Sequence, residues 1–276
     1  MIKKSLGQHF LTDPRILARI VDALEPSPDD CVVEIGAGKG SLTRVLASRV
    51  HTVVAVEKDR ALARDCGLWI ADCGLKNVTI VEGDILRLAW RDLIPQSAIT
   101  NPQFKVIGNI PYYITTPIIE QALRERPALI VLLVQEEVAD RIASPPGSKT
   151  YGALSVGVQV EAQVEKLFGV KAGAFTPPPK VHSAVIRLRP LERPLVAASE
   201  VPAFQTFVAA CFSLRRKTLR NVLRAITGRP GAVVEAALAT LQYDPRARPE
   251  TIAPDRFVKL WRWSNAGPDL RPEGGL

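Results

Sequence analysis

The chain has 276 residues, of which 47% are hydrophobic, and this is enough to bury the core of one large domain and a smaller second one. The N-terminal residues contain no apolar signal segment, and the longest aliphatic run, Ile130–Val134, is too short to span a bilayer, so we expect a cytoplasmic protein. The four cysteines form no CxxC pair and have no histidine at ligand spacing, so we expect no disulfide and no metal, while the net charge of +8 favours an acidic partner.

A short helix is the first predicted element. Asp13 is a typical N-cap residue, and Pro14 fits the first turn of a helix. Apolar residues then recur at helical spacing up to about Leu24. We therefore expect one face of this helix to pack against the body of a domain.

A glycine-rich segment, VVEIGAGKGSLT, occupies residues 32–43. Its first four residues predict a buried strand, and its glycines predict a tight turn into a helix that starts near Ser41. At the carboxyl edge of a parallel sheet, such a loop presents bare backbone N–H groups to a ligand. The G-x-G-x-G spacing with Glu34 inside the strand favours S-adenosylmethionine over a dinucleotide, and an ordinary glycine turn is the alternative. We expect Glu34, Gly36 and Gly38 in a cofactor site.

Acidic residues end the next two predicted strands. Glu57 closes the strand at 52–57, where nucleotide-binding sheets place a carboxylate that accepts both ribose hydroxyls. Asp84 follows the strand at 78–81, where it can accept a hydrogen bond from an adenine amino group. A surface glutamate and a turn-forming aspartate are the structural alternatives. The expected cofactor site therefore includes these two acids and the residue after each: Glu57, Lys58, Asp84 and Ile85.

The sequence Asn109-Ile110-Pro111-Tyr112 follows a fourth predicted strand at 105–108 and carries the most specific chemistry. An adenine amine is a poor nucleophile because its lone pair is delocalised into the ring. Hydrogen bonds to the Asn109 amide oxygen and the Ile110 carbonyl favour its nucleophilic form, and Pro111 stiffens the turn. Tyr112 offers a face on which an extruded base stacks. We expect these four residues to be catalytic without a general base, and Asn109 to contact the cofactor as well.

The middle of the chain predicts the rest of an α/β fold, a Rossmann-like sheet with helices on both faces. The segment 151–161 fits either a helix or a strand. The other expected elements are helices at 59–71, 115–126 and 136–143 and strands at 128–135 and 184–188.

A stiff proline-rich loop, FTPPPKVHS, is predicted at residues 175–183. Phe175 at its entrance is the candidate for a second stacking face in the catalytic site. A core anchor is the alternative interpretation of this phenylalanine.

Prolines and small residues at 190–202 mark a domain boundary. We expect a cofactor-binding domain at 1–190, a small all-α RNA-binding domain at 191–266 and a disordered tail at 267–276. Within the small domain the pattern predicts three helical stretches, at 204–226, 231–241 and 254–263.

The last third of the chain concentrates the positive charge. Residues 185–276 hold 15 Lys and Arg against 8 Asp and Glu, whereas residues 1–184 hold 21 against 20. No acid occurs between Glu200 and Glu235, and a continuous helix at 204–226 would align three arginines in one ridge. This favours phosphate contacts, with a solvated face or pairing with the larger domain as the alternatives. The expected RNA-binding residues are Lys180, Arg215, Arg216, Lys217, Arg220 and Arg224.

Six segments together resemble the ribosomal RNA adenine N6-dimethyltransferase family, and its small-subunit branch in particular. They are QHFL (8–11), EIGAGKGSLT (34–43), EGDIL (82–86), NIPYYI (109–114), FTPPPKVHSAV (175–185) and FSLRRKTLRNVL (212–223). The resemblance implies a class I methyltransferase fold with S-adenosylmethionine as the methyl donor. It also implies dimethylation of two adjacent adenosines in a hairpin loop near the 3′ end of small-subunit ribosomal RNA, coupled to ribosome biogenesis.

The resemblance also implies that Gln8, His9 and Leu11 lie over the cofactor. His9 stands where the family often has Asn, and Tyr113 stands where other members carry Asn. We expect a monomer whose partner is the small ribosomal subunit or its RNA.

Three other functions share parts of this pattern. A large-subunit ribosomal RNA adenine methyltransferase would share the catalytic motifs, and a protein-glutamine methyltransferase would use a similar amide pocket. A non-catalytic RNA-binding assembly factor could keep the same fold. The segment FSLRRKTLRNVL and the triple-proline loop resemble the small-subunit branch better than the large-subunit one. The basic C-terminal segment argues against a protein-glutamine methyltransferase, and the filled catalytic positions argue against a non-catalytic factor.

Overall fold

The structure is a computed structural model that describes residues 8–94 and 104–266. The chain forms two compact units, Met1–Ala139 with Gln163–Pro190, and Asp140–Ala162 with Leu191–Leu276. The expected border after Pro190 coincides with a change of unit. Residues 140–162, which we expected in the first domain, group instead with the C-terminal helices. The tail predicted at 267–276 lies outside the described residues.

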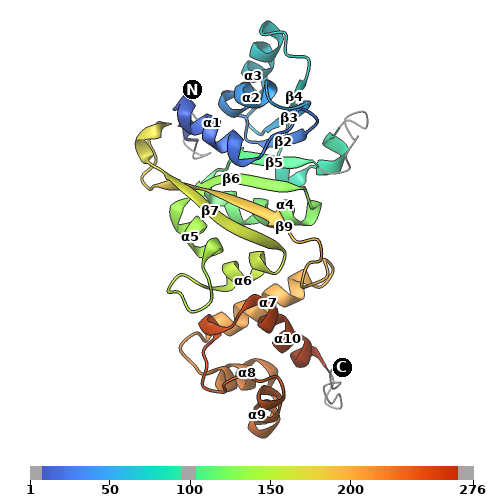
Figure 1. Cartoon of the computed structure of the whole chain (residues 1–276), viewed down its shortest axis with the longest axis vertical. Helices are drawn as coiled ribbons and strands as arrows, with labels where there is room; N and C mark the ends of the chain where they lie inside the picture. Colours follow the sequence, from blue (N-terminus) through green and yellow to red (C-terminus); the bar gives the residue numbers. More distant parts are fainter. Residues whose placement is uncertain (1–7, 95–103, 267–276) are drawn as a thin grey trace. The chain divides into compact units, whose positions relative to one another are not determined.

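A seven-stranded sheet organises the first unit, in the order β4-β3-β2-β5-β6-β9-β7 (Figure 1). The neighbours from β4 to β6 are parallel, and β9 pairs antiparallel with β6. A two-stranded sheet joins β1 (Phe10–Leu11) to β8 (Phe175–Thr176). The large sheet consists of β2 (Cys31–Ile35), β3 (Thr52–Glu57), β4 (Val78–Glu82), β5 (Lys105–Asn109), β6 (Leu129–Gln135), β7 (Ala162–Val170) and β9 (Ser183–Pro190).

The order of the strands reverses at β2, which has β3 on one side and β5 on the other. In open α/β sheets, ligands bind at the carboxyl ends of strands where the order reverses in this way. The glycine loop after β2 therefore lies at the expected binding edge. Among the described strands, β1, β7 and β8 were not predicted. The segment 151–161, which fitted either a helix or a strand, contains α6 (Ala153–Gln159), and β7 begins directly after it.

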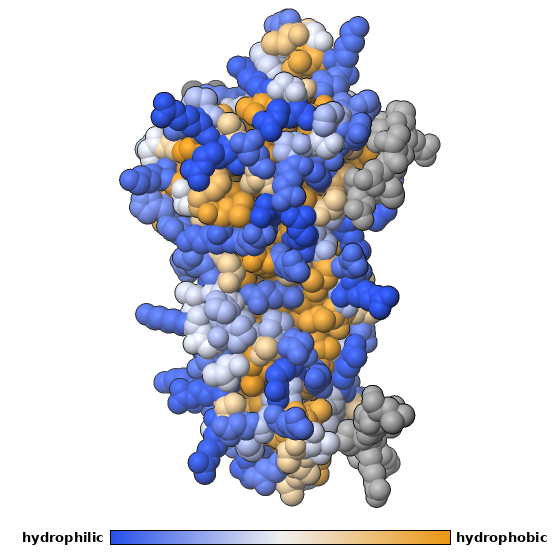
Figure 2. Space-filling model, in the orientation of Figure 1, coloured by the Kyte–Doolittle hydropathy of each residue, from blue (hydrophilic) through white to orange (hydrophobic). Residues whose placement is uncertain are grey.

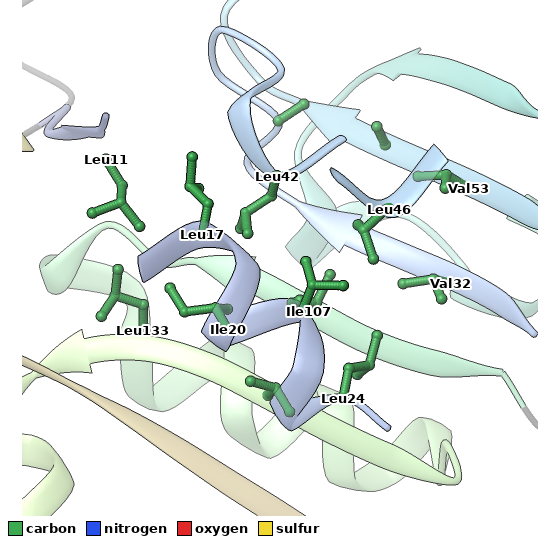
Figure 3. Packing of buried hydrophobic residues seen from close by; sticks show 14 of the residues in the cluster. Leu11, Leu17, Ile20, Leu24, Val32, Leu42, Leu46, Val53, Ile107 and Leu133 are labelled. Carbon is green, nitrogen blue, oxygen red and sulfur yellow. The ribbon is translucent and has the colours of Figure 1, made fainter. Parts of the chain in front are cut away.

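Apolar residues of α1 (Pro14–Ala23) and α2 (Ser41–Ala47) cover one face of the sheet. In Figure 3, the side chains of Leu17 and Ile20 point toward Leu42 and toward the strands. The Asp13 carboxylate caps α1 by accepting from the N–H groups of Arg15 and Ile16, as predicted. Alternate residues of the strands pack with these two helices in one hydrophobic cluster. They include Val32, Val53, Ala55, Ile107, Val131 and Leu133.

The opposite face of the sheet is also buried. The residues between those alternate positions point to the other side, and Val33, Val54 and Val106 are at most 1% exposed. Helix α4 (Thr115–Glu125) buries Ile118 and Ile119 outside the first cluster. The predicted α/β fold with helices on both faces is therefore confirmed, and it is completed by α3 (Arg60–Asp72) and α5 (Glu136–Ala143).

The second unit is built from helices around its own core, in which Phe204 and Phe257 are fully buried and Trp261 packs edge-on against Phe204. The expected all-α character of the C-terminal third is confirmed. The helices are α6 (Ala153–Gln159), α7 (Val201–Ser213), α8 (Leu219–Thr227), α9 (Gly231–Thr240) and α10 (Pro254–Asn265).

The continuous helix predicted at 204–226 is wrong, because α7 ends at Ser213 and α8 begins at Leu219. The N–H of Leu219 donates to the Ala247 carbonyl (2.7 Å), and the N–H of Arg220 donates to the Pro245 carbonyl (3.3 Å). A later loop thus binds two N–H groups that a continuous helix would use internally. Local sequence pattern does not reveal such a long-range contact.

Within the described residues, no helix is long and apolar enough to cross a membrane, and no group of three His, Cys, Asp or Glu is arranged to hold a metal ion. All four cysteines are free thiols in this structure. On the face that Figure 2 shows, hydrophilic residues surround the hydrophobic patches.

Candidate functional site

A cavity opens at the carboxyl edge of the sheet, between the N-terminal segment, the glycine loop and the ends of β3, β4 and β5. Four of the five predicted catalytic residues line it: Asn109, Ile110, Pro111 and Tyr112. The structure also brings every predicted cofactor-binding residue to this one cavity: Gln8, His9, Leu11, Glu34, Gly36, Gly38, Glu57, Lys58, Asp84, Ile85 and Asn109.

The Glu57 carboxylate holds the glycine loop in place. Its Oε2 accepts a hydrogen bond from the Gly38 N–H (2.8 Å), and its Oε1 accepts one from the Asp59 N–H (2.8 Å). The side chain is only 7% exposed, so these bonds form away from bulk water. Each carboxylate oxygen keeps a second acceptor position, which a ribose diol could use.

Glu34 lies beneath the glycine loop and is 1% exposed. The Thr43 hydroxyl donates to its Oε2 (2.7 Å). Burial raises the pKa of Glu34 to about 8, and the nearby Glu57 charge acts in the same direction. Burial therefore favours the neutral, protonated form of Glu34.

Asp84 forms an ion pair with Lys58, whose Nζ lies 2.9 Å from Asp84 Oδ2. The Lys58 hydrogen bond lowers the pKa of Asp84, and the Leu86 N–H adds to this by donating to Oδ1 (3.1 Å). Ile85, which is 5% exposed, adds an apolar wall beside this ionised carboxylate. This combination suits an adenine ring, which has an apolar face and an amine that needs an acceptor.

The N-terminal segment crosses the glycine loop and is held there by the proline-rich loop. Phe10 pairs with Thr176 in the small sheet, and the His9 Nδ1–H donates to the Pro177 carbonyl (2.8 Å). The Phe10 ring contacts Gly38, where an added Cβ would lie 3.1 Å from the ring. Because Gly38 also has a φ of +57°, glycine is needed there for both backbone and steric reasons.

The same segment orients Asn109. Its side-chain Nδ2 donates to the His9 carbonyl (2.9 Å), and no donor among the described residues reaches its Oδ1. The next N–H, of Ile110, donates to the Leu133 carbonyl (3.1 Å), which fixes the turn to β6. Before it, Gly108 has no room for a side chain, since an added Cβ would lie 2.7 Å from the Ile35 carbonyl oxygen. The amide oxygen is thus left as a rigid, unused acceptor.

Tyr112 is anchored by its hydroxyl, which lies 2.7 Å from the Oγ of Ser183. Ser183 is fully buried in β9, and burial raises the pKa of Tyr112. The ring of His9 stacks 6.0 Å away at an interplanar angle of 25°. Sequence reasoning did not single out Ser183, although it ends the proline-rich motif.

Phe175 is not placed as a stacking face. The ring is 3% exposed, belongs to the core cluster beneath α1 and is not among the residues that line the cavity. Its backbone pairs with Leu11 in the small sheet, which directs the side chain inward. In this structure Phe175 is a core anchor, and its predicted catalytic role is not supported.

The predicted ridge of RNA-binding arginines is only partly present. Arg216 lies in the turn before α8, so it does not share a helix with Arg220 and Arg224. Arg220 forms an ion pair with Glu235, and Arg215 pairs with Glu250 (3.7 Å) and donates to the Lys149 carbonyl (3.0 Å). The acid-free stretch of sequence did not prevent these pairs, because acids beyond it fold back onto the arginines.

Three of the predicted cations have no carboxylate partner among the described residues and are exposed: Arg216, Lys217 and Arg224. Lys217 and Arg224 line a hollow together with Asn221 and Arg229, and no acid lines it. Lys180, in the first unit, is also exposed.

The comparisons with known proteins agree with this geometry. A family model described as ribosomal RNA adenine dimethylase matches residues 1–263. The chain is 42% identical over 263 residues to the ribosomal RNA small subunit methyltransferase A of Geobacter metallireducens, with 94% of each chain covered. It resembles the crystal structure of a dimethyladenosine transferase from Plasmodium falciparum (TM-score 0.77, 26% identity, covering 91% of this chain and 96% of that one). It also resembles the 23S rRNA methyltransferase ErmE (TM-score 0.71, 28% identity, covering 93% and 100%).

We predict that Glu57→Ala weakens S-adenosylmethionine binding by about 1.5 to 3 kcal/mol, because charge-assisted hydrogen bonds to a buried carboxylate are lost. Calorimetry on the purified variant measures this. Glu57→Gln should also weaken binding, since its amide NH₂ would face one of the two backbone N–H groups that the carboxylate now accepts. Unchanged affinity in both variants would remove Glu57 from the site.

Glu34 should make the protein less stable as the pH rises. Its folded pKa of about 8 lies above the ordinary value, so the folded state binds a proton that the unfolded state has released. The free energy of unfolding should therefore fall between about pH 4.5 and pH 8 relative to Glu34→Gln, which keeps an acceptor for Thr43. Urea unfolding of both proteins across this range checks the prediction, and parallel curves would contradict it.

Proposed function

We propose that this chain, which belongs to the ribosomal RNA adenine dimethylase family, methylates the N6 atoms of two adjacent adenosines in a hairpin loop near the 3′ end of small-subunit ribosomal RNA. The observation that carries the proposal is the Asn109 amide, held by the His9 carbonyl with its oxygen unused, beside the Tyr112 ring in one cavity. The small-subunit substrate is supported by the 42%-identical relative from Geobacter metallireducens, which is a ribosomal RNA small subunit methyltransferase A.

The methyl donor is S-adenosylmethionine, which supplies an electrophilic methyl group on a sulfonium ion. Glu57 and Asp84 would accept from its ribose and adenine, and the backbone of the glycine loop would lie against it. The fit rests on the two carboxylates and the apolar Ile85, which line one cavity, and on the bare backbone at Gly36 and Gly38.

The chain's own contribution to the chemistry is to position and polarise the target amine. The Asn109 Oδ1 and the Ile110 carbonyl accept from N6, which draws its lone pair out of the ring. Tyr112, fixed by Ser183, holds the extruded base by stacking. After transfer, N6 carries an additional bond and a positive charge, and it loses a proton to water without a protein base.

RNA binding would come from the exposed cations of the C-terminal unit and from Lys180. We assign the phosphate contacts to Arg216, Lys217 and Arg224, and no longer to Arg215 and Arg220, which are paired with carboxylates. A monomeric, cytoplasmic enzyme that acts on the assembling small subunit fits this assignment and is part of the proposal.

Large-subunit RNA is the second candidate substrate, because the fold also matches the 23S rRNA methyltransferase ErmE. The identity is lower there, 28% against 42%. Incubation with labelled S-adenosylmethionine and either unmethylated small subunits or large subunits separates the two. Labelling of neither would favour a non-catalytic assembly factor.

We expect Asn109→Ala to keep S-adenosylmethionine affinity while losing about a hundredfold or more in the rate of methyl transfer, the scale seen when one preorganised polar contact to a transition state is deleted. Single-turnover assays with small subunits measure the rate, and calorimetry measures the affinity. Ser144→Ala, which removes a hydroxyl bonded to the Asp140 carbonyl and to Thr150, is a control for loss of a polar group outside the cavity. A normal rate in Asn109→Ala would refute the amide mechanism.

Replacing Arg216, Lys217 and Arg224 together with Gln should make the logarithm of subunit affinity depend less steeply on salt. The slope should fall by up to about 0.7 to 0.9 for each lost phosphate contact. Filter binding at several salt concentrations measures it. The matched control is Arg215→Gln with Arg220→Gln, which breaks ion pairs and should lower stability while leaving the salt slope nearly unchanged. The reverse pattern would show that the paired arginines leave their carboxylates for RNA.

A further inference from the structure

Tyr113 is an exposed aromatic residue at the edge of the cavity. Its exposed fraction is 58%, and it is the one Phe, Tyr or Trp among the described residues that is classed as exposed. Within the described part of the chain, no hydrogen bond reaches its hydroxyl. The ring is thus open to solvent beside the cavity, where a ligand can stack on it.

Tyr113 and Tyr112 face different directions. Both belong to the single 3-10 turn Tyr112–Ile114, in which successive residues point about 120° apart. The hydroxyl of Tyr112 is fixed inward to the buried Ser183, whereas Tyr113 lines the cavity and still reaches solvent. The Tyr112 ring therefore lies inside the cavity, and the Tyr113 ring lies at its mouth.

Positive charge lies next to the Tyr113 ring. Tyr113 and Lys58 line the same cavity, where the Lys58 Nζ lies 2.9 Å from Asp84 Oδ2. Arg87 lies on the turn that Asp84 starts, and its backbone N–H donates to the Asp84 carbonyl (2.8 Å). Lys58 is half exposed, and Arg87 is exposed and has no carboxylate partner among the described residues, so this part of the rim carries a cation that no ion pair neutralises.

A flat aromatic ring on the same rim as Lys58 and the unpaired Arg87 matches the two halves of a nucleotide, its base and its phosphate. We propose that Tyr113, Lys58 and Arg87 form a subsite for the nucleotide adjacent to the target adenosine. The target base enters the cavity toward Tyr112, and the neighbouring base, still outside, stacks on Tyr113 while its phosphate meets Arg87 and Lys58. The subsite deepens the proposed function and rests on it for the identity of the RNA.

The first test uses Tyr113→Ala and Tyr113→Phe in steady-state methylation of unmethylated small subunits. We expect Tyr113→Ala to raise the KM for subunits about tenfold, at the low end of one lost base–aromatic stack, and Tyr113→Phe to stay within about twofold of wild type. Leu68→Ala is the matched control, because Leu68 is 59% exposed in the same unit and does not line the cavity. S-adenosylmethionine affinity should not change in any variant.

The second test reads stacking directly and does not depend on turnover. A short RNA hairpin carrying 2-aminopurine next to an adenosine is titrated with the full chain, and we expect its fluorescence to be quenched by wild type, Tyr113→Phe and Leu68→Ala but not by Tyr113→Ala. Equal quenching by wild type and Tyr113→Ala, or none by wild type, overturns the subsite. A loss of S-adenosylmethionine affinity in Tyr113→Ala with unchanged KM would also overturn it, since the ring would then cover the cofactor. Wild type that quenches but does not methylate would instead contradict the proposed function.

Discussion

The rest of the site depends on the two hydrogen bonds that the Glu57 carboxylate accepts from backbone N–H groups. They join the end of β3 to the glycine loop after β2 through Gly38, and to the start of α3 through Asp59, whose own side chain caps that helix. An amide could not accept at both atoms, so an acid is required. Burial raises the pKa of Glu34 below it, which favours the neutral form of that side chain, while both Glu57 oxygens remain acceptors that the loop and a ligand can share.

The cavity is assembled from segments that are far apart in the chain. His9 donates from its ring to Pro177 and accepts at its carbonyl from Asn109, which are 168 and 100 residues away. Among the described residues 8–12, the small β1–β8 sheet, these two bonds and the bonds from Thr12 to the Ala174 carbonyl hold the N-terminal segment over the glycine loop. The proline-rich loop thus acts as a fixed support for the segment that orients the catalytic amide.

Features that depend on local sequence pattern could be predicted from the sequence. The parallel strands, the Asp13 cap and the gathering of eleven dispersed residues at one cavity followed from periodicity, turn residues and the resemblance. The predictions from sequence were wrong where a residue far away in the chain determines the local structure. The loop at 244–248 splits the expected long helix, Glu235 and Glu250 neutralise two expected phosphate ligands, and Leu11 draws Phe175 into the core.

The cavity has a cofactor-binding part and a base-binding part, and different elements of the fold hold each in place. The proposed cofactor contacts include Glu57, Asp84 and Lys58, which are held by β3, β4 and their own ion pair. The proposed contacts to the target base include Asn109 and Tyr112, both of which touch His9, through its carbonyl and its ring. A displacement of the N-terminal segment would therefore disturb amide orientation and base stacking together, while leaving most of the cofactor contacts in place.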